Sequence, residues 1–383
     1  MTTHDKTKPD YLQAARPFFP AEDRRIILRE LDGMLASGQL TMGPWVDKLE
    51  QTAASMLNNA YTVATNSGTS ALEMLLRYFD VRDREVIVPT NTFVASANAV
   101  LMAGGQPVLA DIEAATLALS PKTLEQRISP RTGGVIVVHI AGLISPRMDE
   151  IKALCKGKGL FCIEDAAHAF GAACPGGAAG DLADGAAFSL FPTKPVTSGE
   201  GGLVVTRDRQ CAQFARSYRC HGIDAEHKCN DFIRLGHNFR MSEITALVGE
   251  TNMRRSIQAR RLKQHVADAY MNFFAGSPCT FPLVPKTWTH SWYKFPLTLP
   301  AGIDVNAIRA ACKKSAIACQ SCYWPPVHRQ PFYASREQSA PGMFPCAEDV
   351  LARTISLPIF AGMTEDQIER VCHTVIAAVK AAC

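Results

Sequence analysis

Lys194 is the residue of this chain best suited to covalent chemistry. It follows the apolar run Ala186 to Leu190, within Phe191-Pro192-Thr193-Lys194-Pro195, and precedes the turn Gly199-Glu200-Gly201-Gly202. An amine beside an apolar strand loses hydration, which lowers its pKa and makes it a nucleophile able to form a Schiff base. The alternative is a solvated loop lysine, as most lysines are.

Two carboxylates and a histidine follow a second apolar run. Leu160-Phe161-Cys162-Ile163 leads directly into Glu164 and Asp165, with His168 three residues later. Side chains alternate along a strand, so only one of the two carboxylates points to the interior side of the loop. An Asp there needs a cationic partner or hydrogen bonds to stay ionised, and a protonated heterocycle nitrogen would serve. A helix N-cap for Asp165 and an ordinary core or surface histidine for His168 are the alternatives.

Gly68 and Thr69 lie in a turn that opens a helical pattern, in Asn66-Ser67-Gly68-Thr69-Ser70-Ala71-Leu72-Glu73. Glycine lets the backbone approach a ligand, and the free amides and dipole of a helix N-terminus favour an anion. This pattern indicates a phosphate-binding turn. A helix capped by the pair Ser70 and Glu73 explains the segment equally well. The turn lacks the lysine of a P-loop and the G-x-G-x-x-G spacing, which argues against a nucleotide-binding fold.

A lysine, an aspartate and a phosphate anchor are together what pyridoxal phosphate (PLP) requires of a protein. The lysine binds the aldehyde, the aspartate keeps the pyridine nitrogen protonated so that the ring withdraws electrons, and the turn holds the phosphate. The sequence therefore favours PLP as cofactor.

The cysteines offer weaker candidates for a metal site. Thirteen cysteines are scattered through apolar segments, which favours reduced, buried thiols over a disulfide framework. Cys319 and Cys322 have the spacing of half a zinc site, but no second pair completes it. Four further residues have the types of metal ligands: Cys220, His221, His227 and Cys229. Such spacings are common by chance, so we expect no metal.

The composition restricts the class of protein. With 383 residues, 47% hydrophobic and 20% charged, the chain is globular and long enough for two cores. It has no apolar run of about 18 residues, so we expect no membrane span. Its N-terminus lacks the apolar core of a signal peptide, which favours a cytoplasmic location.

The densest basic group is Arg254, Arg255, Arg260, Arg261 and Lys263. Its helical spacing favours a solvated helix face over a nucleic-acid site.

Strands and helices alternate between residues 60 and 206, which predicts a mostly parallel sheet covered on both faces. The expected strands are Tyr61 to Thr65, Glu85 to Val88, Pro107 to Ala110, Val135 to His139, Leu160 to Glu164, Ala186 to Leu190 and Leu203 to Thr206. The expected helices are Ser70 to Tyr78, Val94 to Ala103 and Met148 to Lys156. Ligands bind beyond the carboxyl ends of such strands, where the candidate residues lie.

A second, smaller domain is expected toward the C-terminus. A long helical pattern runs from about Met241 to Phe274, and the remainder carries one strand and two helices, near Phe295 to Leu299, Val305 to Ser315 and Glu365 to Ala381. We expect residues 1–255 to form an N-terminal arm with a large PLP-binding domain, and residues 256–383 to form the small domain.

Six motifs in order resemble those of the DegT-type sugar aminotransferases. They are Ser67 to Leu72, Pro89 to Ser96, Ile163 to Ala172, Phe191 to Lys194 with Gly199 to Gly202, Cys220 to Gly222 and Leu235 to Glu243, with Pro325 to His328 as a weaker seventh. The resemblance implies an α/β fold of the type I PLP-dependent transferases, with a mostly parallel sheet in a large domain and a smaller α+β C-terminal domain. It also implies transfer of an amino group from glutamate or glutamine to a keto sugar, free or nucleotide-linked, or to a related keto substrate of a biosynthetic pathway.

The resemblance implies roles for individual residues as well. Lys194 would hold PLP as a Schiff base, Asp165 would pair with the pyridine nitrogen, and Phe93 would stack on the ring. His168 would lie near the phenolic oxygen, where the family commonly has Gln or His.

Phosphate and substrate contacts are implied in the same way. Gly68, Thr69 and Ser189 would hold the phosphate, and Asn238 would reach it from the neighbouring subunit, so that a homodimer shares its active sites. The implied substrate-side groups are Arg240, Tyr323, His328 and the loop Gln39 to Pro44.

One departure and two alternatives qualify this interpretation. Pro195 stands where relatives often have Asn, which removes a hydrogen-bonding side chain and fixes the backbone beside the reacting amine. A dehydrating branch of the family has His at the position of Lys194, so the lysine argues against that branch.

The alternatives are a PLP enzyme of another reaction type, such as elimination, racemisation or oxidation, and a non-catalytic regulatory member. The intact set of Lys194, Asp165 and Ser189 argues against the second.

Overall fold

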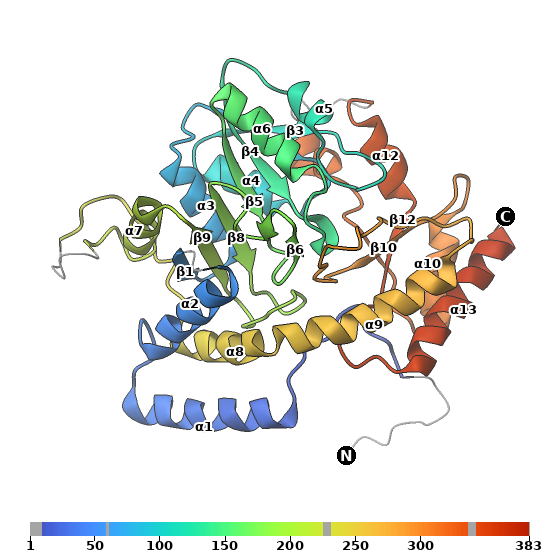
Figure 1. The fold of residues 1–383 in the computed structure, drawn as a ribbon, viewed down its shortest axis with the longest axis horizontal. Coiled ribbons are helices and arrows are strands. Elements are labelled where there is room, and N and C mark those ends of the chain that lie inside the picture. Colours follow the sequence, from blue (N-terminus) through green and yellow to red (C-terminus); the bar gives the residue numbers. More distant parts are fainter. Residues whose placement is uncertain (1–9, 59–60, 225–230, 336–341, 383) are drawn as a thin grey trace.

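A seven-stranded sheet forms the centre of the molecule. The structure, a computed structural model, describes residues 10–58, 61–224, 231–335 and 342–382. The strands are β1 (Tyr61–Thr65), β2 (Glu85–Pro89), β3 (Gln106–Ala110), β4 (Thr132–Val138), β5 (Phe161–Asp165), β8 (Gly185–Ser189) and β9 (Gly202–Thr206). Their order is β1-β9-β8-β5-β4-β2-β3, and β9 alone of these seven runs antiparallel to both of its neighbours. The predicted mostly parallel sheet is confirmed (Figure 1).

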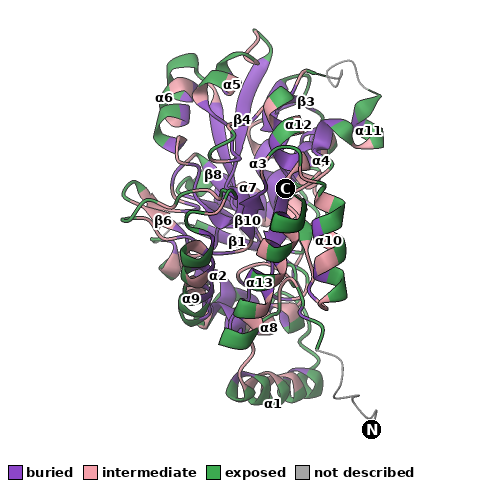
Figure 2. Cartoon of the chain, turned by 90° about the vertical axis from the view of Figure 1, so that its right-hand side faces the viewer, coloured by how far each residue is buried: buried purple, intermediate pink, exposed green. Residues whose placement is uncertain are grey.

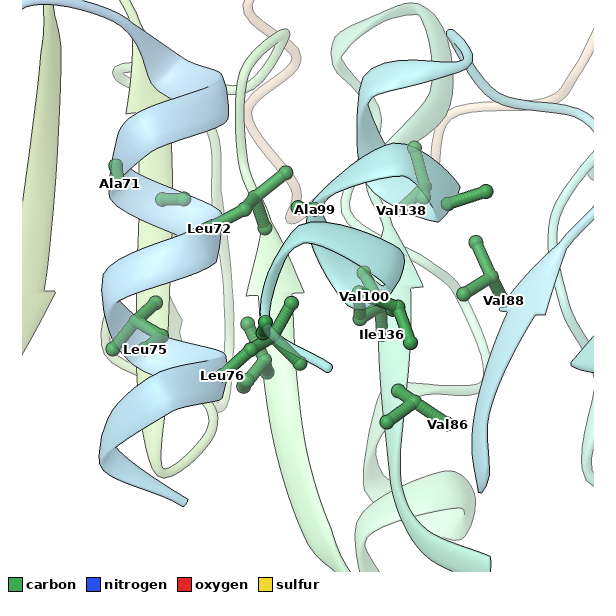
Figure 3. Close-up of a cluster of buried hydrophobic side chains, with 14 of the residues drawn as sticks. Ala71, Leu72, Leu75, Leu76, Val86, Val88, Ala99, Val100, Ile136 and Val138 are labelled. Carbon is green, nitrogen blue, oxygen red and sulfur yellow. The ribbon is translucent and has the colours of Figure 1, made fainter. Parts of the chain in front are cut away.

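Alternate residues of the strands fill two different cores, one on each face of the sheet. Val86 and Val88 of β2 belong to the first core, whereas Ile87 between them belongs to the second. The first face is covered by α3 (Gly68–Tyr78), α4 (Ala95–Met102) and α7 (Arg209–Tyr218), and the second by α2 (Pro44–Met56), α6 (Met148–Lys158) and α8 (Glu243–Arg254). Figure 3 shows the first core, where Leu72 and Leu76 of α3 lie on the side of the helix that faces α4. Burial of both faces explains why the strands are continuous apolar runs.

The structure has two helices where the sequence suggested one long helical pattern, from Met241 to Phe274. α8 ends at Arg254 and α9 spans Ser256–Phe274, with Arg255 between them at φ −88° and ψ −4°. The two helices run along one side of the molecule, and α1 (Ala21–Ser37) lies beside α8 (Figure 1). Arg255 donates hydrogen bonds to both carboxylate oxygens of Asp23 on α1, which anchors α1 at this junction. Most of the remaining surface of α1 is exposed (Figure 2).

A three-stranded antiparallel sheet forms the second, smaller layer. It is built from β10 (Phe295–Thr298), β12 (Thr354–Leu357) and β11 (Gln320–Ser321), in that order. Its core is shared with α9, α10 (Val305–Lys314) and α13 (Glu365–Ala382). The expected strand and both expected helices of this part are therefore confirmed. The remaining elements are α5 (Pro121–Glu125), β6 (Ala173–Cys174), β7 (Gly177–Ala178), α11 (Pro331–Ala334), α12 (Pro345–Ala352) and the short 3-10 helices η1 (Ile140–Gly142) and η2 (Val327–Arg329).

Each of the two sheets packs against side chains from a distant part of the chain. Leu12, near the N-terminus, packs in the core of the small sheet and forms a bridge with Ile317. Conversely, side chains between Cys322 and Leu351 pack in the first core of the large sheet. The division at residues 255 and 256 falls on the junction of α8 and α9, and as a domain boundary it stays a prediction.

Two expectations about charge and membranes can be compared with the structure. Arg254 and Arg261 are exposed, but Lys263 of the same basic group is only 8% exposed, so the expectation that it lies on a solvated helix face is wrong. Its helix α9 packs on the small sheet, and Lys263 faces inward. Within the described ranges, no helix combines the length and the apolar character that crossing a bilayer requires.

Candidate active site

A cavity of about 370 Å³ lies at the carboxyl edge of the large sheet. Its walls come from the turns that follow β1, β2, β5 and β8, completed by two tyrosines from the C-terminal part of the chain. The predicted residues that line it are Gly68, Thr69, Phe93, Asp165, His168, Ser189, Lys194 and Tyr323. The structure therefore brings together residues that are far apart in the sequence, at the edge where parallel strands place ligands.

The turn after β1 ends in a helix N-terminus that opens on the cavity. Ser67 caps α3, because its Oγ accepts a hydrogen bond of 3.1 Å from the amide of Ser70. The predicted cap by Ser70 and Glu73 is thus wrong: the helix begins at Gly68, and the Glu73 carboxylate is buried, where it accepts a hydrogen bond from Tyr218. Because the cap is Ser67, Gly68 and Thr69 occupy the first turn, where helix amides lack intrahelical acceptors.

Close packing explains the glycine at position 68. A Cβ at this position would lie 2.8 Å from Cβ of Ser189 at the end of β8. Gly202 at the start of β9 is equally constrained, since its Cβ would lie 2.3 Å from the carbonyl oxygen of Ser67. The turn is therefore held against the ends of β8 and β9, which puts Ser189 next to the first turn of α3.

Asp165 is the last residue of β5, and its carboxylate is fixed by two hydrogen bonds. Oδ2 accepts a bond of 2.6 Å from Ser96 Oγ, and Oδ1 accepts one of 3.1 Å from the amide of Ala167. A turn and not a helix follows, so the alternative of a helix N-cap is wrong. Glu164 points to the other side of the strand, fully buried and 2.8 Å from Nε2 of His139, as the predicted alternation requires.

His168 lies between two tyrosine rings. Its ring centroid is 4.3 Å from that of Tyr293 and 5.7 Å from that of Tyr323, and Oη of Tyr323 is 2.7 Å from Nε2. Burial lowers the pKa of His168 well below its usual value and raises the pKa of Tyr323 well above its usual value. The imidazole is thus neutral and the phenol protonated. We assign the donor role in this bond to Tyr323, which leaves the proton of the imidazole on Nδ1. Nδ1 is buried and has no hydrogen-bond partner among the described residues.

Lys194 presents its amine to the cavity from the loop after β8. Nζ lies 4.5 Å from the centroid of the Tyr293 ring, which contributes a cation–π contact. The pKa of Lys194 is lowered to about 8, mainly by burial; Asp165 opposes this shift, and the nearby cation Lys294 contributes to it. The loss of hydration predicted from the sequence is confirmed, and a larger fraction of the amine is neutral and nucleophilic near neutral pH.

The donor set of this cavity fits PLP. It combines an amine of lowered pKa, a fixed carboxylate, a helix N-terminus beside a serine, and a buried Nδ1 of His168 for which the described residues offer no partner. These groups match the aldehyde, the ring nitrogen, the phosphate and the phenolic oxygen of PLP, respectively.

Three of the predicted site residues do not reach the cavity of their own chain. Asn238 is exposed and pairs through its backbone with Cys220, and the Arg240 guanidinium lies 3.4 Å from Cys220 Sγ. His328 is only 1% exposed; Nδ1 is 2.7 Å from Thr90 Oγ1 and Nε2 is 3.1 Å from Glu348. These bonds give His328 a structural place between the end of β2 and α12.

The predicted substrate loop, Gln39 to Pro44, also lies outside the cavity lining. It leads into α2, and the Glu243 carboxylate accepts hydrogen bonds from the amides of Gly43, at 2.9 Å, and Val46, at 3.0 Å. The loop is thereby fixed against the start of α8.

The metal candidates receive no support where the structure describes them. Within those residues, no group of three or more His, Cys, Asp or Glu side chains is arranged to hold an ion. His227 and Cys229 lie outside the described residues.

Sequence reasoning missed two residues that shape the site. Tyr293 supports both His168 and Lys194, but it lies in the C-terminal part of the chain, and no local pattern connects it with the large sheet. Ser96 was within a recognised motif, and its hydroxyl on a carboxylate becomes visible only once β5 and α4 are placed. A polar residue in the first turn of the helix after β2 was the available signal.

Comparison with known proteins gives the family. The profile of the DegT/DnrJ/EryC1/StrS aminotransferase family matches residues 22–376. A UDP-N-acetyl-3-dehydro-alpha-D-glucosamine 3-aminotransferase of Acidithiobacillus ferrooxidans is 33% identical over 360 residues, covering 94% of each chain. GDP-perosamine synthase of Caulobacter vibrioides is 32% identical over 364 residues, covering 94% of this chain and 96% of that protein.

Solved structures show the same likeness. PseC of Helicobacter pylori, an aminotransferase of pseudaminic acid biosynthesis, superposes with a TM-score of 0.90 at 27% identity, covering 97% of this chain and all (100%) of that one. DesI, solved with its TDP-sugar product, superposes with a TM-score of 0.89 at 28% identity, covering 98% and 94% of the two chains. The family predicted from the motifs is confirmed: this chain belongs to the DegT/DnrJ/EryC1/StrS aminotransferase family and is a PLP-dependent aminotransferase of fold type I.

Proposed function

We propose that this aminotransferase delivers an amino group from glutamate or glutamine to the keto carbon of a sugar in a biosynthetic pathway. The observation that carries the proposal is the joint presence of Lys194, Asp165 and His168 in one cavity with the phosphate-binding turn. The relatives support the sugar acceptor, because several of their names contain a sugar or an aminosugar.

The residues of the cavity have distinct proposed roles toward PLP. Lys194 would hold its aldehyde as a Schiff base, and Asp165 would keep its ring nitrogen protonated. Phe93, which is 59% exposed at the cavity, would cover one face of the ring, and the Nδ1 proton of His168 would be donated to the phenolic oxygen. The phosphate ligands would be Gly68, Thr69 and Ser189, with Asn238 of a second subunit.

Proton transfer is the proposed task of Lys194. When bound, PLP supplies a ring that withdraws electrons from the carbon bearing the amino group. The Nζ of Lys194 would take a proton from that carbon and deliver it to the carbon on the other side of the amino nitrogen, and its pKa of about 8 suits both directions near neutral pH. Asp165 would stabilise the positive charge of the ring nitrogen, because Ser96 and Ala167 fix its carboxylate.

A homodimer with shared active sites is part of the proposal. Phe93 and Asn238 are both exposed in the single chain, although the resemblance assigns both to the cofactor. A second chain that covers Phe93 and supplies Asn238 would account for both observations. The cytoplasmic location expected from the sequence stays a prediction.

The test is a pair of half-reactions followed by absorbance. PLP-loaded protein treated with glutamate or glutamine should lose its visible band as the pyridoxamine form accumulates, and a keto sugar, free or nucleotide-linked, should restore the band. If glutamate and glutamine both leave the band unchanged while another amino acid undergoes elimination or racemisation, the proposal is wrong and the other PLP chemistry is correct.

A further inference from the structure

A second, much smaller cavity lies against the loop that carries Lys194. Its volume is about 20 Å³, and its walls come mainly from the N-terminal arm at residues 15–18, the loop between residues 192 and 197, and the helices α8 and α9. Asn252 of α8 connects the loop with the arm: its side chain accepts a hydrogen bond of 3.0 Å from the amide of Thr197 and donates one of 2.9 Å to the carbonyl oxygen of Phe18. The cavity therefore lies within a fixed frame of three segments that are distant in the sequence.

Lys263 of α9 is the buried cation that lines this cavity. It is only 8% exposed, and in the part of the chain that the structure describes its amine has no hydrogen-bond partner and no carboxylate within 4.0 Å. Burial lowers the pKa of Lys263 to about 8, which leaves most of the amine charged at neutral pH. A buried charge without a counter-charge is costly, so the site favours the approach of an anion.

The charges around the cavity are all positive. Arg16, at the exposed end, and Lys194 line it together with Lys263, and none of the described lining residues is Asp or Glu. His290 lies near Lys263 but offers no counter-charge, because its ring is neutral: burial, with a contribution from Lys263, lowers its pKa to about 3. Attraction between opposite charges is stronger in such low-dielectric surroundings than in water. An anion that enters the cavity would therefore be held more strongly than at a solvated lysine.

The size of the cavity restricts the kind of anion. A cavity needs about 10–15 Å³ to hold one water molecule, so a volume of about 20 Å³ holds one small particle. A chloride ion is only slightly larger than a water molecule, whereas phosphate, sulfate and carboxylates are much larger. The dimensions thus favour a monatomic anion and exclude a phosphate or carboxylate group of a metabolite.

We propose that this cavity binds a single halide ion, chloride being the physiological one, and that Lys263 is its principal ligand. The bound ion would neutralise the buried ammonium group and connect α9 with the N-terminal arm and with the loop that carries Lys194. The site is separate from the proposed cofactor and substrate contacts, and its occupation does not depend on which keto compound accepts the amino group.

A buried water molecule is the competing explanation. Water could accept a hydrogen bond from Lys263 and fill the same volume, but it would leave the positive charge uncompensated. The two explanations differ in their dependence on salt. A water site is indifferent to the kind of anion in the buffer, whereas a halide site stabilises the folded enzyme more as the chloride concentration rises, until the site is saturated.

The experiment compares chloride with gluconate, an anion too large for the cavity. The melting temperature of the PLP-loaded enzyme is measured while sodium gluconate is replaced by sodium chloride at a constant ionic strength of about 0.2 M, so that general screening stays the same. The wild type should gain about 2 °C or more and then level off. Lys263→Met should melt above the wild type in gluconate and show no response to chloride. The matched control is Lys286→Met, which removes an exposed lysine outside the cavity and should respond as the wild type does.

Bromide locates the ion directly. Crystals of the wild-type enzyme grown in sodium bromide should show an anomalous peak beside the amine of Lys263, and this peak should be missing in Lys263→Met. If Lys263→Met fails to fold, Lys263→Gln replaces it, because glutamine is polar but carries no charge. Equal melting temperatures of the wild type in the two salts would overturn the inference. It would also be overturned by a chloride response that persists without the charge of residue 263, or by wild-type crystals without bromide in the cavity.

Discussion

Tyr323 and His168 share a hydrogen bond of 2.7 Å between phenol oxygen and Nε2, with their rings inclined by only 13°. Tyr323 comes from the C-terminal part of the chain and His168 from the loop after β5, so this bond also connects the two parts of the molecule across the cavity.

We expect Tyr323→Phe to destabilise the protein by about 1–2 kcal/mol, because Nε2 of His168 is left buried without a partner. Without Tyr323 as donor, the proton of the imidazole is free to move to Nε2. The absorbance band of bound PLP and its pH titration should therefore shift. Denaturant unfolding and absorbance measure the two effects. Tyr333→Phe is the matched control, since its hydroxyl bonds to Asn98 outside the cavity; it should reduce stability and leave the band unchanged. Identical spectra in both variants would contradict the role given to Tyr323.

The pKa of Lys194 predicts how fast the apoprotein captures PLP at different pH values. The neutral amine is the reactive form, and burial lowers the pKa of Lys194 to about 8. The capture rate should therefore rise with pH and level off above about pH 8, instead of continuing to rise toward pH 10.5, the usual pKa of a lysine. Stopped-flow absorbance follows the reaction. Lys294→Met should move the midpoint upward, because one neighbouring cation is removed. A midpoint close to that of a solvated lysine would contradict the desolvated site.

Gly68→Ala should weaken PLP binding by about tenfold or more. The added Cβ would lie 2.8 Å from that of Ser189, so the turn must move away from β8 and the first turn of α3 loses its alignment with Ser189. Fluorescence titration of the apoprotein with PLP measures the dissociation constant. Gly33→Ala on α1 serves as the control, since nothing lies within 4 Å of its added Cβ. Equal PLP affinity in the two variants would show that the close packing at position 68 has no bearing on the cofactor.

Replacing Lys263 by methionine should stabilise the protein at neutral pH. Lys263 is 8% exposed and has no hydrogen bond or ion pair with any described residue, and burial lowers its pKa from 10.5 to about 8. Because the folded-state pKa is the lower one, the charged lysine destabilises the fold fully below about pH 8, and the penalty disappears as the pH rises to about 10.5. Lys263→Met should gain about 2–3 kcal/mol at about pH 7 and much less at about pH 10. Urea unfolding at both pH values is the measurement, and a gain that does not depend on pH would rule out this explanation.

Shared active sites predict complementation between two inactive variants. Lys194→Ala removes the reacting amine and Asn238→Ala removes the proposed contact from the second subunit, so each homodimer should be strongly impaired. In a mixed dimer, one site contains an intact Lys194 and receives an intact Asn238 from its partner. Mixing the variants under exchange conditions should therefore restore a substantial part of the activity. A mixture no more active than the separate variants would argue that each chain completes its own site.

The sheet and the edge that carries the site could be predicted from sequence because their signals are local. Val86, Ile87 and Val88 are apolar on both faces, as a strand buried on both sides requires, and polar residues follow the strands where ligands bind. Lys194 and Asp165 were placed at this edge in this way, and both line the cavity. Short apolar runs and turns are contained within a few residues, so no knowledge of distant contacts was needed.

The misses have a different physical origin, because each depends on contacts between distant segments. Ser67 is the helix cap instead of Ser70 because the packing of Gly68 on Ser189 fixes where α3 begins. His328 is the last residue of the seventh motif, but Thr90 and Glu348 hold it away from the cavity. The sequence alone does not contain such distances.

The exchange of side chains between the two cores has a consequence for protein engineering. Leu12 packs with the small sheet, whereas Cys322 and Leu351, with several described residues between them, pack with the large one, so neither part of the molecule has a core made only from its own segment of the chain. A chimera with a relative, spliced at residue 255, would create mismatched contacts in both halves at once. A chimera that folds should take the N-terminal arm and the small sheet from the same parent. The walls of the cavity and the segment that carries Tyr323 should likewise come from one parent.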